Sequence, residues 1–174
     1  MSLCRAAQHY SNRYRFEFTS CNFFPIIRNY TINPGENQVD FTVTPYIRIK
    51  NLSITYDATA KKVNASFTIE GGSSSVKVST LKLYAWTDMY VGENVKKTLV
   101  TGTGTPTRTL TGAAQTINPA TVYNLSIDLA VNQGTDKNGF GVHRNYYFRV
   151  GALATLTGVG TIRYNYAPYV VIAL

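Results

Sequence analysis

The chain has 174 residues, of which 44% are hydrophobic and only 15% are charged, with 17 basic against 9 acidic side chains. This length and composition favour one globular domain, or one domain with a fragment of another, and exclude a disordered chain, a coiled coil and collagen. Aromatic residues make up 13% of the chain and include 13 Tyr, which with frequent Thr, Ser and Gly is typical of an all-β protein.

The first part of the chain holds few strands. A turn over residues 33–37 precedes an expected strand at 39–43, whose alternate side chains are apolar. Two or three strands in residues 1–44 are too few to fold alone. Thr44-Pro45 then predicts a kink before two alternating runs, at 46–50 and 52–56. We therefore expect a partial β segment over 1–44 and a separate unit over 45–174.

From residue 45 onward the apolar residues alternate almost throughout. Strands are expected at 63–69, 78–86, 122–130, 146–156 and 162–172. Turn residues separate them at 56–61, 71–75 and 132–139, and the Thr- and Gly-rich stretch 102–116 is either a long loop or an irregular edge strand. No stretch shows a helical period. Seven or so short strands with this punctuation predict a β-sandwich.

Motifs that would identify an enzyme or a cofactor are lacking. The sequence contains no phosphate-binding loop, no dinucleotide-binding glycine motif and no nucleophile elbow. Its two His and two Cys have no zinc-like spacing. His143 and Asp136 are close in the sequence, but a surface histidine is the favoured interpretation. We expect a protein that is not an enzyme, with no cofactor and no metal.

The positive charge and the start of the chain bear on partners and location. The formal net charge is +8, but the only adjacent basic pairs are Lys61-Lys62 and Lys96-Lys97, so nucleic-acid binding is not expected. No signal peptide precedes Cys4. Either the protein is cytoplasmic or an export segment is absent from this chain. Whether Cys4 and Cys21 form a disulfide is left open.

Four blocks of the sequence carry a resemblance to a known family. They are residues 43–49 (VTPYIRI), 87–92 (TDMYVG), 147–152 (YFRVGA) and 163–168 (RYNYAP). Together they resemble the C-terminal domain of an uncharacterised Bacteroidetes lipoprotein family whose members sit beside SusC/SusD-like glycan importers. The resemblance implies an immunoglobulin-like or fibronectin type III-like β-sandwich over 45–174, export, and a lipidated N-terminus.

The resemblance also implies a partner and a location. Family members carry a complete N-terminal domain similar to the transthyretin-like regulatory domain of carboxypeptidases, whereas residues 1–44 match only its last part. Residues 1–44 are thus expected to be a remnant of that domain, and the lipid anchor, the only expected membrane contact, is absent from this chain. A polysaccharide, or a SusC/SusD-like complex at the outer membrane or cell surface, is the expected partner.

Three aromatic residues are the candidate ligand-binding residues. Trp86 is the only Trp, and with Tyr84 or Tyr90 beside it could stack on a sugar ring. The competing interpretation places Trp86 in the core of the sandwich, and cross-strand pairing explains the Tyr residues of the last two strands. Arg149 and Arg163 are expected on neighbouring strands of a solvated face, with an anion or acidic-sugar contact as the alternative.

These observations lead to two hypotheses. The first is a non-enzymatic accessory protein of the cell envelope, which binds glycans or acts as a scaffold in a polysaccharide-uptake system. The second is a structural or adhesin-like module that assembles through exposed strand edges, since the partial sheet over 1–44 leaves edges open.

Overall fold

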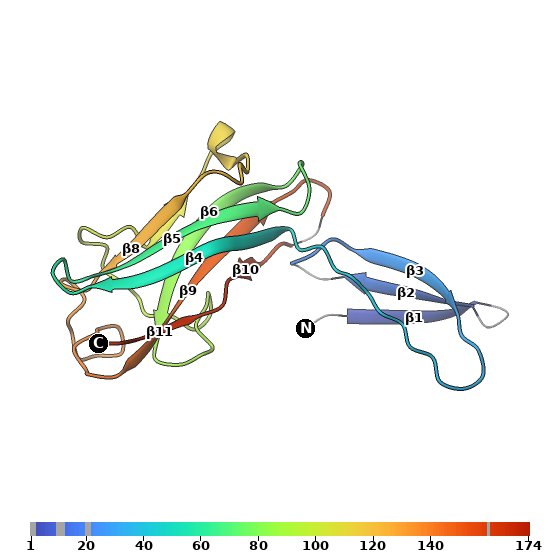
Figure 1. The fold of residues 1–174 in the computed structure, drawn as a ribbon, viewed down its shortest axis with the longest axis horizontal. Coiled ribbons are helices and arrows are strands. Elements are labelled where there is room, and N and C mark those ends of the chain that lie inside the picture. Colours follow the sequence, from blue (N-terminus) through green and yellow to red (C-terminus); the bar gives the residue numbers. More distant parts are fainter. Residues whose placement is uncertain (1–2, 10–12, 20–21, 160) are drawn as a thin grey trace.

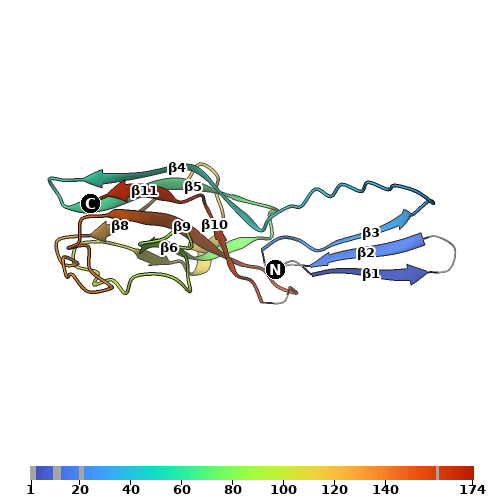
Figure 2. The same ribbon diagram turned by 90° about the horizontal axis from the view of Figure 1, so that it is seen from below.

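The chain forms two β units that lie end to end, a small N-terminal sheet and a larger β-sandwich (Figures 1 and 2). The computed structural model describes residues 3–9, 13–19, 22–159 and 161–174. All strand pairs between the named strands are antiparallel.

The N-terminal sheet has the order β1-β2-β3. Its strands are β1 (Leu3–His9), β2 (Arg13–Thr19) and β3 (Ile26–Thr31). The chain after β3 runs back along this sheet to the sandwich (Figure 2). The predicted strand over 39–43 is wrong, because this stretch joins no sheet. Its alternation has another cause: the Phe41 ring packs on Phe16, Phe18 and Tyr30, with centroids 4.1 to 6.1 Å apart.

The sandwich confirms the predicted all-β class. One sheet has the order β4-β5-β8, made of β4 (Ile47–Asp57), β5 (Lys62–Gly71) and β8 (Tyr123–Asp128). The other has the order β10-β9-β6-β7, and β11 also pairs with β9. Its strands are β6 (Lys77–Trp86), β7 (Thr107–Thr109), β9 (Asn145–Thr155), β10 (Tyr164–Tyr166) and β11 (Val170–Ala173).

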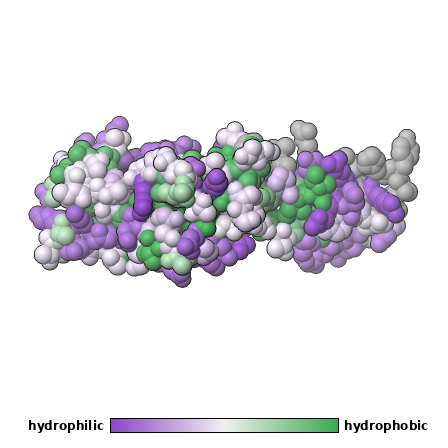
Figure 3. Space-filling model, turned by 90° about the horizontal axis from the view of Figure 1, so that it is seen from above, coloured by the Kyte–Doolittle hydropathy of each residue, from purple (hydrophilic) through white to green (hydrophobic). Residues whose placement is uncertain are grey.

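The core lies between these two sheets and follows the predicted alternation. Val63, Ala65, Phe67 and Ile69 of β5 are all buried, and they face buried residues of β6 and β9 such as Leu83 and Phe148. Burying one such large side chain stabilises the fold by about 1.5–3 kcal/mol. The surface is mixed: on the face that Figure 3 shows, hydrophobic residues form separate patches among hydrophilic ones.

Three details of the sandwich depart from the sequence-based expectation. The single strand expected at 162–172 is two strands, β10 and β11, with residues 167–169 between them. The runs at 46–50 and 52–56 belong to one strand, β4, whose register shifts between Lys50 and Ser53. Asn51 lies in this irregularity with φ of 51° and donates a hydrogen bond through Nδ2 to Thr68 Oγ1. The stretch 102–116 combines both alternatives, because the short edge strand β7 is followed by a 3-10 helix, η1 (Gly112–Gln115).

The end of the sandwich away from the N-terminal sheet gathers distant parts of the sequence. The turn between β4 and β5, the loop between β8 and β9, and strand β11 all lie there (Figure 1). We call this end the tip of the sandwich.

Candidate functional site

The three predicted ligand-binding residues lie in different environments. Tyr84 is only 2% exposed and faces away from the core of the sandwich. Trp86 is half-buried at the end of β6, and Tyr90, in the loop that follows, is 74% exposed. Tyr84 therefore offers no open ring face to a sugar, and the structure does not combine all three residues into one stacking surface.

Tyr84 takes part in a polar network instead. Its hydroxyl donates a 2.6 Å hydrogen bond to Glu93 Oε2, and Lys82 Nζ lies 3.0 Å from both oxygens of the same carboxylate. Lys96 Nζ is 2.8 Å from Glu93 Oε1. Burial raises the pKa of Glu93, but these three donors outweigh it and hold that pKa at about 2. The network ties the loop after β6 to its sheet.

Further aromatic residues cover Tyr84. The rings of Tyr164 and Tyr166 lie 6.0 and 5.9 Å from it, centroid to centroid. The Arg149 guanidinium sits 4.8 Å over the Tyr166 ring, and its Nε donates to the Ala167 main-chain oxygen at 2.7 Å. Arg149 thus holds the chain between β10 and β11 in place.

Trp86 has neighbours that the sequence analysis did not single out as ligand-binding. It lies opposite Tyr147 in the ladder between β6 and β9, so both side chains share the outer face of the sheet. The Tyr147 ring packs edge-on against Tyr169, 5.3 Å away. We call Trp86, Tyr147 and Tyr169 the aromatic strip. Only the register of β6 against β9 brings Trp86 and Tyr147 together.

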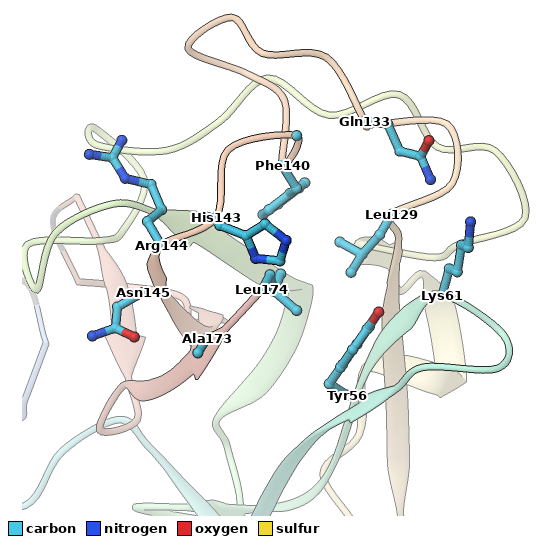
Figure 4. Close-up of a pocket in the computed structure, with 11 residues that line it drawn as sticks. Tyr56, Lys61, Leu129, Gln133, Phe140, His143, Arg144, Asn145, Ala173 and Leu174 are labelled. Atoms are coloured by element: carbon cyan, nitrogen blue, oxygen red, sulfur yellow. The ribbon is translucent and has the colours of Figure 1, made fainter.

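The clearest concave site lies at the tip of the sandwich. This tip pocket has a volume of about 950 Å³ and its wall includes the side chains of Leu129, Phe140 and Leu174 (Figure 4). Residues with polar side chains also line it: Tyr56, Lys61, Gln133, His143, Arg144 and Asn145. Sequence reasoning missed this site, because its residues come from three segments that only the strand topology brings together.

Local backbone bonds hold those three segments. In the β4–β5 turn, Asp57 Oδ1 accepts a hydrogen bond from the main-chain N–H three residues later, and Lys61 adopts a left-handed φ of 51°. The Lys61 main-chain oxygen accepts from the N–H of Leu129, at the end of β8. Arg144 and Leu174 exchange two main-chain hydrogen bonds, which hold the C-terminal segment against the residue before β9.

The tip pocket combines stacking with hydrogen bonding. Tyr56 is 42% exposed, and in Figure 4 its ring and that of His143 lie on facing sides of the pocket. A few polar groups around an apolar surface are typical of small-molecule sites. None of the described residues that line the pocket is Asp or Glu, so its side chains do not supply the two carboxyl groups of a glycosidase.

The pairing of His143 with Asp136 considered from the sequence is not favoured by the local geometry. Asp136 Oδ1 accepts hydrogen bonds from the N–H groups of Asn138 and Gly139 in its own loop. Within the described residues, no group of three or more His, Cys, Asp or Glu could hold a metal ion. No helix in that part of the chain is long and apolar enough to cross a membrane. A Cys4–Cys21 disulfide lies outside the described residues.

Comparison with known proteins identifies relatives of this fold. Residues 47–170 match a family model described as a domain of unknown function, DUF3823_C. A structure from Bacteroides uniformis, named as a "putative carbohydrate binding protein", is 40% identical, with a TM-score of 0.76 over 93% of this chain and 73% of that one. Comparison with curated proteins gave no match.

Two more distant structures share the fold. A DUF3823 family protein from Bacteroides ovatus has 17% identity and a TM-score of 0.60, over 96% of this chain and 78% of that one. Another from Parabacteroides merdae has 20% identity and a TM-score of 0.59, over 93% and 71% of the two chains. In all three cases the likeness covers both β units.

Proposed function

The chain belongs to the DUF3823_C family, and from this premise we propose that it is a non-enzymatic carbohydrate-binding protein of the cell envelope. The relative from Bacteroides uniformis, 40% identical over most of the chain, is itself named as a "putative carbohydrate binding protein", which supports the proposal. Its partners would be a polysaccharide and the SusC/SusD-like importer beside which the resembled family sits.

The observation that carries the proposal is the tip pocket. An exposed tyrosine ring lines the pocket together with Gln133 and Asn145, whose amide groups both donate and accept hydrogen bonds. A pyranose has an apolar face and a rim of hydroxyl groups, so it fits a site with one aromatic surface and several planar polar groups. The open position at the end of an elongated molecule gives a glycan chain access to this site (Figure 1).

A glycan array with the purified protein tests the proposal and locates the site. We expect binding to at least one glycan, which Tyr56→Ala weakens by about tenfold or more because a stacked ring contributes on the order of 1 kcal/mol or more. Trp86→Ala, in the aromatic strip, is the matched aromatic variant and should leave that binding within about twofold. Circular dichroism checks the fold of both variants.

Each outcome of the array has a distinct meaning. Loss of binding in the folded Trp86→Ala variant alone would transfer the site to the aromatic strip while the proposed function stands. No binding to any neutral or acidic glycan would overturn carbohydrate binding itself.

The second candidate function is assembly through strand edges. The order β1-β2-β3 leaves β1 without a second ladder partner among the described residues, and an open edge can template pairing with another chain. Size-exclusion chromatography discriminates the two: a stable monomer over the micromolar range argues against assembly, and concentration-dependent oligomers favour it.

A further inference from the structure

We infer that the tip pocket selects glycans that carry a negative charge, as a uronate carboxylate or a sulfate group, over neutral glycans. The inference rests on the proposed function, since it names the class of glycan that the same pocket takes. It follows from the charges that line the pocket, from where the nearby carboxylates are engaged, and from a buried cation behind the wall.

Two basic side chains line the pocket, and among the described residues neither has a paired carboxylate. Lys61 and Arg144 lie on opposite sides of it in Figure 4. Over the residues that the structure describes, neither side chain forms an ion pair, and no lining residue is acidic. Some exposed cations elsewhere are paired, as where Arg48 and Lys50 both approach Glu70.

The carboxylates of the surrounding loops accept hydrogen bonds from nearby N–H and hydroxyl groups. Asp57 Oδ1 accepts a 2.9 Å hydrogen bond from the Ala60 N–H. Asp128 Oδ2 accepts from the N–H and the hydroxyl of Thr103, at 2.9 and 2.6 Å. Asp136 Oδ1 accepts from main-chain N–H groups of its own loop. These acids stabilise turns, and among the described residues none of them forms an ion pair with Lys61 or Arg144.

A third cation lies behind the pocket wall. Lys97 is only 4% exposed, and its Nζ lies 5.0 Å from the centroid of the Phe140 ring that lines the pocket. Its ammonium donates to two main-chain oxygens, those of Gly139 at 2.6 Å and Lys137 at 2.8 Å, and it forms no ion pair within the described part of the chain. Burial lowers the pKa of Lys97. The negative charge of Asp136 raises this pKa, and the positive charge of Arg144 lowers it further.

The sum of these groups is a positive pocket. Lys61, Arg144 and Lys97 leave an excess of positive charge there, even when a free α-carboxylate at Leu174 and the carboxylate of Asp136, which acts on Lys97, are set against them. A guanidinium binds a carboxylate or a sulfate through two parallel hydrogen bonds, and a lysine adds a point charge. With the Tyr56 ring for the apolar face of the sugar, an acidic glycan matches the pocket better than a neutral one.

Titration calorimetry with matched oligosaccharides tests the inference. The probes are oligomers of galacturonic acid, sulfated galactose oligomers and neutral galactose oligomers of equal length. We expect at least one acidic series to bind about tenfold or more tighter than the neutral series, and its affinity to fall as salt is raised from 0.01 to 0.15 M. The two acidic series distinguish a carboxylate from a sulfate.

Charge-removing variants show which cations act. Arg144→Gln and Lys61→Gln should each weaken acidic binding about tenfold and change neutral binding less than about twofold. Lys77→Gln is the control and removes one positive charge elsewhere. Lys77 begins β6, where it pairs with Thr155 at the far end of β9, so this variant should leave the binding of acidic and neutral oligomers unchanged. Circular dichroism checks the fold of each variant. If Arg144→Gln does not fold, Lys61→Gln still tests the inference, because the Lys61 side chain is exposed.

Contrary outcomes separate this inference from the proposed function. Equal or tighter binding of neutral oligomers, or a loss in Lys77→Gln as large as in Lys61→Gln, would overturn acidic selectivity while carbohydrate binding stands. Binding of no oligosaccharide by the folded protein, here and on the array, would overturn both.

Discussion

Glu93 stabilises the outer layer of the second sheet, because one carboxylate accepts hydrogen bonds from Lys82 and Tyr84 and forms an ion pair with Lys96. Glu93→Gln removes the charge on which both lysines depend. We expect a loss of about 1–2 kcal/mol in the free energy of unfolding, measured with urea at pH 7. Glu70→Gln is the control. Its ion pairs are exposed and 3.7 to 3.8 Å long, so it should cost less than about 0.5 kcal/mol. Equal losses in the two variants would contradict this role.

The same residue makes stability depend on pH in a defined direction. The folded pKa of Glu93 is about 2, below its ordinary value of 4.5, so its contribution is complete above pH 4.5 and is lost as the pH falls towards 2. Asp128, held by Thr103, has a pKa of about 2 and adds to the same loss. The gap in unfolding free energy between wild type and Glu93→Gln should therefore be constant from pH 7 to about 5 and shrink below that. A gap that is unchanged at pH 3 would refute this assignment.

At the scale of elements, the segment over 32–46 closes one face of the N-terminal sheet with a single ring. Phe41→Ala leaves Phe16, Phe18 and Tyr30 without their cover. Because Phe41 is half-buried, we expect the free energy of unfolding to fall by about 2 kcal/mol, less than the 3–5 kcal/mol for a fully buried phenylalanine. Hydrogen exchange should show lost protection in β2 and β3 and unchanged protection in β5 and β9. Val43→Ala, at an exposed position, is the control and should change neither sheet. Lost protection in the sandwich as well would mean that the two units fold together.

The strands of the sandwich could be predicted from the sequence because their apolar alternation has one cause, the core between two sheets. β5 and β6 follow it with few departures. The stretch 39–43 shows the limit of this reasoning. Its alternation is as regular as that of a strand, but Phe41 packs onto a sheet that the segment does not join. Periodicity reports which side chains are buried and not which backbone groups are paired.

The candidate site was less predictable for a related reason. Tyr84 and Trp86 are neighbouring aromatic residues in the sequence. In the fold, however, Tyr84 is covered by the loop after β6 and by β10, whereas Trp86 stays half-exposed. Tyr56 and Arg144 are far apart in sequence and meet only because β4 and β9 both reach the tip. Sites built across strand ends depend on topology, which a local pattern does not contain.

At the scale of the whole molecule, the two units are joined by a short and specific junction. Phe24 packs edge-on against the buried Tyr46, with centroids 4.8 Å apart. The Asn22 main-chain oxygen accepts hydrogen bonds from the Tyr46 N–H and from Asn165 Nδ2 of β10, both at 3.0 Å. These bonds connect the loop between β2 and β3 to the residue before β4 and to β10, which belong to the two sides of the sandwich. An elongated and rigid molecule would hold the tip pocket away from whatever the N-terminal sheet contacts, which is the arrangement that a glycan-capturing protein at a surface needs.

The junction is closely packed at Gly72, which directly follows β5. Gly72 N–H donates to the Tyr46 oxygen at 2.9 Å, and a Cβ on Gly72 would lie 2.2 Å from the Pro45 oxygen and 3.0 Å from the Phe24 ring. Gly72→Ala must therefore push the junction apart, at a cost of about 1–3 kcal/mol. We expect a larger radius of gyration by small-angle X-ray scattering and faster proteolysis between residues 32 and 46, with intact sandwich strands by hydrogen exchange. Ser73→Ala, at the exposed neighbouring position, should leave all three measurements unchanged. If Gly72→Ala keeps the wild-type radius and protease resistance, the junction is not what fixes the two units end to end.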